Sequence, residues 1–282
     1  MAAFIIIIMT LIISGQNILR KMYNEKTNGE GTYLYLGILS FTAAIFFLIS
    51  SGFKLEILPE LIPYGIAVAV FYAGANYFAI RAIAIGPLSL SALIGAFSLV
   101  VPTTFGIVFY NEGITPWYIV GAVALVLSIF LTNSKKDDTK ITLKWAVCSA
   151  LGAIFNGLFS VTQSLQQRAF DSLYKNELML IGLGLSSLFF FAMAFTKEKK
   201  ILKKCFKHSW SAFAVGASSG IGNLLKMLLM SIMNLSIIFP LINAGSIVAT
   251  AAVAILYYKE KLSRNQLLGM LCGIVTIVFI AL

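Results

Sequence analysis

The sequence predicts an all-α polytopic membrane protein with ten transmembrane helices arranged as two inverted five-helix repeats. Three observations lead to this prediction: the composition, a series of long apolar runs, and a match between the two halves of the chain. Apolar residues make up 59% of the 282 residues and charged residues only 11%, whereas soluble domains are about 45–50% apolar and about 25% charged. A soluble protein of this composition would lack the polar residues to cover its surface, so a bilayer must solvate the excess.

The apolar runs define the predicted helices. A helix needs about 20 apolar residues to cross about 30 Å of hydrocarbon. We expect spans near residues 3–20, 32–51, 62–84, 87–109, 116–132, 143–167, 176–196, 209–232, 236–258 and 264–282. No basic residue precedes Arg20, so the first run is interpreted as a span and not as a signal peptide. Pro87 separates the third and fourth runs, because proline removes a backbone donor and clashes with the preceding turn.

An internal repeat relates the two halves. When the chain is compared with itself, Arg20 faces Arg168, and the same offset places Phe109–Thr115 opposite Tyr257–Ser263. Each copy contains five spans, an odd number, so the second copy must be inverted relative to the first. We therefore predict two repeat units, residues 1–134 and 141–282, that enclose a site at the membrane midplane, an arrangement used for alternating access.

Polar residues inside the runs are the candidate site. An ionisable residue within a span is costly and indicates function, and Lys226 lies about two turns inside the eighth run. Arg81 is close enough to a membrane face for its side chain to reach the interface. No Asp or Glu lies well inside an apolar run, so an unpaired lysine favours a substrate carboxylate or phosphate. The predicted substrate-binding residues are Gln16, Asn17, Tyr72, Asn76, Asn156, Ser160, Gln163, Gln167, Asn223, Lys226, Asn243 and Ser246.

Other interpretations of these patterns remain open. The polar residues of the sixth run recur at helical spacing and share one face, yet hydroxyl and amide side chains also join helices through hydrogen bonds. Tyr72 and Tyr77 are placed where aromatic rings can enclose a quaternary ammonium. The pairs Gly216/Gly220 and Gly269/Gly273 indicate close helix crossings, and the second pair would also suit a dimer.

Motifs for catalysis are missing from the sequence. His208 is the only histidine, and the chain has no phosphate-binding glycine loop and no nucleophile–base set. The three cysteines are spaced too widely for a zinc site or a disulfide framework. We expect no enzymatic activity, no catalytic residue, no metal ligand and no cofactor. The expected partners are a small-molecule substrate and the lipid bilayer, with no nucleic acid, and the expected state is a monomer, with a homodimer as the alternative.

The basic residues predict the orientation. The odd-numbered gaps between runs hold 17 Lys and Arg residues, and the even-numbered gaps hold 3. Short basic loops stay cytoplasmic, so the odd gaps are predicted to face the cytoplasm and both termini to lie outside. The expected location is a cytoplasmic-type cell membrane, crossed many times.

Two short motifs carry a family resemblance. Glu112–Thr115 is followed by Gly121, and Glu260–Ser263 is followed by Gly269, so that in each copy the glycine comes nine residues after the glutamate. Together with Gly15-Gln16-Asn17 in the first run, these motifs resemble those of the ten-span EamA-type transporters of the drug/metabolite transporter superfamily. The resemblance implies transport of a small metabolite, in a family that handles amino acids, sugars, nucleotide derivatives and drugs.

The residues and the resemblance together predict a secondary active transporter of an amino-acid-like zwitterion or an organic anion, working by alternating access. Two alternatives on the same fold are a lipid-linked carrier or flippase and a quaternary-ammonium transporter.

Overall fold

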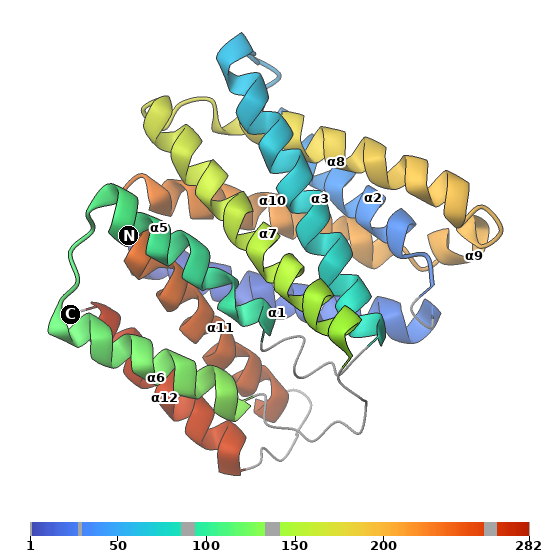
Figure 1. Cartoon of the computed structure of the whole chain (residues 1–282). Helices are drawn as coiled ribbons and strands as arrows, with labels where there is room; N and C mark the ends of the chain where they lie inside the picture. The colour runs from blue at the N-terminus through green and yellow to red at the C-terminus, as the bar shows by residue number, and fades with distance from the viewer. Residues whose placement is uncertain (1, 28–29, 86–93, 133–141, 257–263, 282) are drawn as a thin grey trace.

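The computed structural model of the chain describes residues 2–27, 30–85, 94–132, 142–256 and 264–281, and within these ranges the regular structure is entirely helical (Figure 1). The predicted all-α class is therefore confirmed. The helices are α1 (Ala2–Thr27), α2 (Thr32–Ser50), α3 (Ile62–Ile85), α5 (Val100–Tyr110), α6 (Pro116–Thr132), α7 (Leu143–Ala169), α8 (Lys175–Lys197), α9 (Leu202–Phe206), α10 (Trp210–Met230), α11 (Leu235–Leu256) and α12 (Arg264–Ala281). Two short 3-10 turns, η1 (Pro59–Leu61) and η2 (Phe97–Leu99), precede α3 and α5.

The helix bounds follow most of the predicted apolar runs closely, and three described segments differ. In the predicted run 87–109, the 3-10 turn η2 precedes α5, which begins at Val100. α1 continues to Thr27, past the predicted end of the first run at about residue 20. The short helix α9 lies in the basic gap before α10, where no helix was expected. The predicted break at Gly86-Pro87 falls outside the described residues. Among the described helices, α2, α3 with η1, α7, α8 and α10 are long and apolar enough to cross a membrane.

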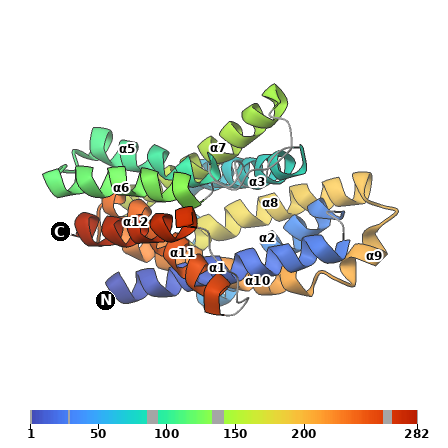
Figure 2. The same ribbon diagram turned by 90° about the horizontal axis from the view of Figure 1, so that it is seen from below.

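Helices from the two halves of the chain interlock. α3 packs against α7 and α8, α2 packs against α8 and α10, and α6 packs against α12. α1 contacts α10 and α11, and α7 contacts α3 and α5, so these two helices join the group that contains α2, α3, α8 and α10 to the group that contains α5, α6, α11 and α12. Both views place α9 at one end of the molecule and both chain termini toward the other (Figures 1 and 2).

Most contacts between the two halves follow an exchange rule: when each helix is replaced by its match in the other half, one observed contact becomes another. We match the halves in chain order, α1 with α7, α2 with α8, α3 with α10, α5 with α11 and α6 with α12. Exchanging the partners turns the α3–α7 contact into α10–α1, α3–α8 into α10–α2, and α5–α7 into α11–α1, all of which are present. The α2–α8, α5–α11 and α6–α12 contacts map onto themselves. The α11–α12, α6–α11 and α7–α10 contacts have no comparable counterpart, so a two-fold relation between the halves would account for most of the pattern and not for all of it.

Small residues permit the close crossings. A Cβ atom on Gly216 would lie 2.6 Å from the carbonyl oxygen of Leu39, and one on Gly220 would lie 2.6 Å from the Phe46 ring, both on α2. The predicted crossing at this pair is confirmed. On α12, the carbonyl oxygen of Gly269 accepts a hydrogen bond of 2.6 Å from the Ser128 hydroxyl on α6. The backbone at this end of the Gly269/Gly273 pair therefore packs inside the chain.

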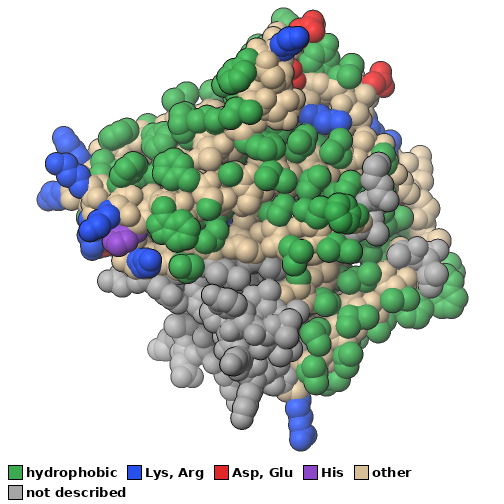
Figure 3. Space-filling view, turned by 180° about the vertical axis from the view of Figure 1, so that it is seen from behind, with side chains coloured by type: hydrophobic (Ala, Val, Ile, Leu, Met, Phe, Trp, Pro, Cys, Tyr) green, Lys and Arg blue, Asp and Glu red, His purple; other side chains and the backbone are tan. Residues whose placement is uncertain are grey.

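The surface is largely apolar. Large side chains such as Phe109, Leu188 and Phe195 are more than 60% exposed, and Figure 3 shows hydrophobic side chains spread over the face that it draws, with Lys and Arg at the margins. Soluble monomers rarely expose contiguous apolar patches larger than a few hundred Å². This surface suits contact with lipid.

The basic end around α9 is held by polar contacts outside the spans. The Lys204 ammonium lies 3.0 Å from the Glu30 carboxylate, and this hydrogen bond raises the pKa of Lys204. The neighbouring thiol of Cys205 is fully buried, and burial raises its pKa. These contacts fasten α9 to the loop between α1 and α2.

Replacing Gly216 tests the α2–α10 crossing. The Gly216→Ala substitution should lower the melting temperature of the purified protein in detergent, because the new methyl group meets backbone and not a flexible side chain. Overpacking of this kind destabilises by about 1–3 kcal/mol. The matched control is Gly184→Ala, since nothing lies within 4 Å of a Cβ atom at that position. Equal melting temperatures for the two variants would contradict the tight crossing.

Candidate substrate site

Polar faces of α7 and α10 meet in the second half of each helix. Gln163 on α7 is fully buried, and its Nε2 donates to Oδ1 of Asn223 on α10 at 3.4 Å and to the sulfur of Met179 on α8 at 3.2 Å. One turn along each helix, Nζ of Lys226 lies 4.6 Å from the centroid of the Phe159 ring, within the range of a cation–π interaction. Helical spacing puts both pairs on the same faces, so the two predicted polar helices do turn toward each other here.

Tyr72 adds α3 to this junction. Its ring is buried and packs edge-on against Phe159 with centroids 5.5 Å apart. Its hydroxyl lies near the side chains of Ser40 on α2 and Ser219 on α10. Asn223 in turn donates to the backbone oxygen of Ser219 at 2.9 Å. We call Tyr72, Phe159, Gln163, Ser219, Asn223 and Lys226 the Lys226 cluster.

The cluster contains an unbalanced cation and unused acceptors. Within the described ranges, two ion pairs join a carboxylate and a basic side chain within 4.0 Å. They involve Arg168 and Lys204, and neither includes Lys226. The Oε1 atom of Gln163 in the cluster, and that of Gln167 one turn further along α7, are buried and have no donor among the described residues. A buried charge or polar group without a partner is costly. The cluster is therefore equipped to bind a ligand that carries both an anionic group and hydrogen-bond donors.

The remaining predicted residues fall into three groups. Gln16 reaches α10, where its Nε2 donates to the Ser218 hydroxyl at 3.3 Å, next to the cluster. Asn156 turns to η2 and donates to the Ser98 hydroxyl at 2.9 Å, and Gln167 donates to its neighbour Gln166. The last group uses its hydrogen bonds within its own helix: Asn76, Ser160, Asn243 and Ser246. The side chain of Asn17 lies outside the described residues.

A second polar assembly connects α5 and α11. Glu112 follows the end of α5, where Asn111 has a left-handed backbone with φ of 51°. Its carboxylate accepts hydrogen bonds from the backbone amides of Leu235 at 3.0 Å and Ser236 at 2.8 Å, at the start of α11. Charge-assisted bonds of this type, aligned with the helix dipole, are strong. The carboxylate also lies so close to Gly106 that a side chain there would clash.

Arg168 joins this assembly from the end of α7. Its guanidinium lies 3.4 Å from the Tyr110 ring centroid, with Nη2 4.0 Å from Oε1 of Glu112. The Tyr110 hydroxyl also receives a hydrogen bond of 3.3 Å from Ser164 on α7. We call Tyr110, Glu112, Arg168, Leu235 and Ser236 the Glu112 latch. The sequence analysis used Arg168 as a marker of the repeat and Glu112 as part of the repeat and of the family motif, and it did not predict their contact.

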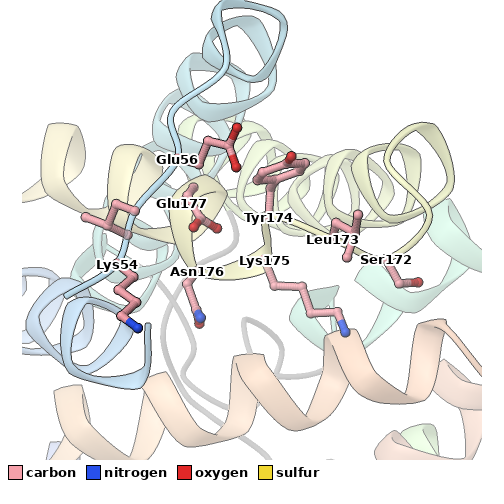
Figure 4. Close-up of a pocket in the computed structure, with 9 residues that line it drawn as sticks. Lys54, Glu56, Ser172, Leu173, Tyr174, Lys175, Asn176 and Glu177 are labelled. Carbon is pink, nitrogen blue, oxygen red and sulfur yellow. The ribbon is translucent and has the colours of Figure 1, made fainter. Parts of the chain in front are cut away.

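An open pocket of about 580 Å³ lies where the loop after α2 meets the α7–α8 loop. Figure 4 shows Lys54, Lys175 and Asn176 directed to one side of it, with Glu56 and Tyr174 directed away from them. The Gln166 side chain of α7 holds one lining residue in place, because its Nε2 donates to the Leu173 backbone oxygen at 2.7 Å. The polar face of α7 thus extends from the Lys226 cluster to this loop pocket.

Comparison with known proteins agrees with the fold. A crystal structure described only as that of a protein is similar, with a TM-score of 0.71 and 12% sequence identity over 96% of this chain and 98% of the other. At this identity the similarity shows the fold alone. No match was found among curated proteins.

The match to a family is confined to the second half of the chain. Residues 143–282 fit the profile of the EamA-like transporter family, and this range includes α7 and α10, which supply most of the Lys226 cluster. The long apolar helices agree with a protein embedded in a membrane. Residues 143–282 of this integral membrane protein are therefore an EamA-like transporter family domain, a family whose members transport small molecules.

Proposed function

We propose that this protein is a secondary active transporter that carries an amino-acid-like zwitterion or an organic anion across the cell membrane by alternating access. The observation that carries this proposal is the half-buried Lys226 side chain, which has no carboxylate partner among the described residues. A substrate carboxylate would supply the missing charge. Taking two opposite charges into a low-dielectric site is favourable only when they pair closely and their other hydrogen bonds are satisfied.

Buried amide oxygens in and beside the cluster favour a zwitterionic substrate. The Oε1 atoms of Gln163 and Gln167 can each accept a hydrogen bond from an ammonium group. Gln163 is one helical turn from Phe159, so this acceptor is a neighbour of the Lys226 site on the same face of α7. An α-amino acid carries its carboxylate and ammonium close together, which matches one cation beside one free acceptor. An organic anion would use the lysine and leave the amide oxygen without a donor.

The architecture in this proposal is ten spans in two inverted units, residues 1–134 and 141–282. The exchange rule among the helix contacts supports the two-fold relation. With five spans per unit, the related halves have opposite orientations, which allows two equivalent conformations open to opposite sides. The basic α9 end is then cytoplasmic, by the charge bias of the loops.

The Glu112 latch closes the opposite side in this scheme. It ties the start of α11 to the end of α5 and carries the end of α7 with it. These connections belong to even-numbered gaps, which the charge bias places outside. In this proposal the external side is held shut in the described conformation, and releasing the latch would let α5 and α11 separate.

The alternatives fit less well. A quaternary ammonium would be repelled by Lys226 and cannot donate hydrogen bonds to the amide oxygens. A lipid-linked carrier needs an opening toward the bilayer that reaches the polar site. The apolar groove between α3, α7 and α8 contains no member of the Lys226 cluster.

Substitution of Lys226 tests the charge argument. Lys226→Ala should weaken binding of the best ligand from a panel of amino acids, organic anions and choline by about 100-fold or more, because breaking a buried pair costs about 3–5 kcal/mol. Binding is measured by calorimetry on detergent-purified protein. Lys144→Ala, at an exposed position, is the control and should leave affinity unchanged. Unchanged affinity in Lys226→Ala, or choline as the best ligand, would refute the assignment.

Substitution of Gln163 separates the two substrate classes. Gln163→Leu removes the amide acceptor while it keeps a similar volume. If the substrate is a zwitterion, its affinity should fall about 10-fold, since a buried hydrogen bond to a charged group is worth about 1.5–3 kcal/mol. The affinity of the matching des-amino acid should change little. Equal loss for both ligands would contradict recognition of the ammonium group by Gln163.

Substitution of Glu112 tests the latch. In a variant with the native cysteines replaced by alanine, Ser236→Cys should react slowly with an impermeant maleimide, because Ser236 is only 1% exposed. Adding Glu112→Gln removes the charge that holds the α11 amides and should accelerate labelling severalfold in intact cells. Glu56→Gln, in the loop pocket, is the control. Labelling that stays slow in the Glu112→Gln protein would show that this contact does not hold the external side shut.

A further inference from the structure

A groove on the outside of the helix bundle is separate from the proposed transport site. It has a volume of about 350 Å³ and lies between α3, α7 and α8. Its lining includes the small residues Ala69, Ala73 and Gly74 of α3 and the rings of Phe155 and Phe189. Val70 and Phe189 are about half exposed. The groove therefore opens toward the lipid and not toward the bundle interior.

A cationic side chain, Arg81, lies beyond one end of the groove. Its α3 residues run from Ala69 to Tyr77, and Arg81 lies one turn beyond. Nε of Arg81 donates to the Tyr77 hydroxyl at 3.3 Å, and the guanidinium carbon lies 5.8 Å from the Tyr77 ring centroid. The Tyr77 ring is itself stacked on Tyr33, with centroids 6.1 Å apart. Arg81 is thus held in place at the end of the groove by an aromatic side chain that also lines it.

Arg81 has no counter-charge within the described part of the chain. No carboxylate of those residues lies within 4.0 Å of its guanidinium. The carboxylate of Glu198, which acts electrostatically on Tyr33, is already bound by the backbone amides of Tyr33 and Leu34 at 3.0 Å each. Most of the guanidinium donors therefore remain available, and Arg81 is exposed.

The surroundings favour an anion at this position. Lys197, at the end of α8, acts electrostatically on Tyr77, and Lys144 lies at the start of α7. This end of the three helices belongs to the basic side of the protein, which the charge bias places in the cytoplasm. The cytoplasmic leaflet is the one that carries anionic lipids.

We propose that the groove between α3, α7 and α8, together with Arg81, binds one anionic phospholipid, with its phosphate at the guanidinium and an acyl chain against Ala69, Ala73 and Gly74. The guanidinium fork suits a phosphate because it can form two parallel hydrogen bonds. The small residues leave room for the chain, and the Tyr77 ring lies between the two parts. This lipid would rest on the outside of the bundle and would not be transported.

Thermal stability in mixed micelles tests the proposal. The full-length protein is melted in dodecyl maltoside with added dioleoyl phosphatidylglycerol or dioleoyl phosphatidylcholine. Phosphatidylglycerol should raise the melting temperature of the wild type by several degrees more than phosphatidylcholine. Arg81→Gln should abolish that difference, while Lys207→Gln, which removes an exposed charge next to α9 at the same end of the protein, should retain it. A phosphatidylglycerol effect of equal size in Arg81→Gln would overturn the proposal.

Two further arms separate the head group from the acyl chain. Inorganic phosphate and dihexanoyl phosphatidylglycerol should fail to reproduce the shift, because neither fills the groove. Ala73→Leu, which fills part of the groove, should reduce the shift from the long-chain lipid without lowering the melting temperature in its absence. A full shift with phosphate alone, or a full lipid response in Ala73→Leu, would show that the groove is not the site.

Discussion

The absence of water from the hydrocarbon region is the constraint on which this structure depends. Every polar group placed there must find its partner within the protein or on a ligand. Most polar side chains of the spans comply locally, as Asn76 and Asn243 do by bonding to their own helices. Lys226 and the Oε1 atom of Gln163 do not find a charged partner or a donor among the described residues. Other buried polar atoms also have no partner among the described residues, but here a cation and an amide acceptor lie in one cluster, and this combination distinguishes them from polar residues that only join helices.

The interlocked halves explain how such a site is kept in place. The Lys226 cluster takes Tyr72 from the first half of the chain and Phe159, Gln163 and Asn223 from the second, so neither half can assemble it alone. The crossings that bring the halves together depend on glycine, since Gly216 lets the α2 backbone approach α10. The contacts that pack the two halves together therefore also form the Lys226 cluster, and movement of one half against the other would alter the cluster directly.

The sequence was informative about helices and less so about contacts. Run length predicted most helix bounds within a few residues, because a 20-residue apolar run has few other solutions in lipid. The short helix α9 was missed, since its lysines read as a polar loop. Periodicity placed Asn156 and Gln163 on one face but could not reveal that Asn156 turns to Ser98 and Gln163 to Asn223. Nor could it show that Glu112 caps a helix more than 120 residues later, because such pairings are set by tertiary structure.

The Glu112 latch has a consequence for the way this end of the molecule comes apart. Its carboxylate saturates two amide groups that the first turn of α11 cannot satisfy itself. When α5 and α11 separate, the carboxylate and the two amides lose their hydrogen bonds and only water can replace them. Water must therefore enter as the helices separate. Lipid tails cannot substitute for that solvent. The Glu112 latch would therefore open where it faces an aqueous compartment and stay closed where it faces the bilayer.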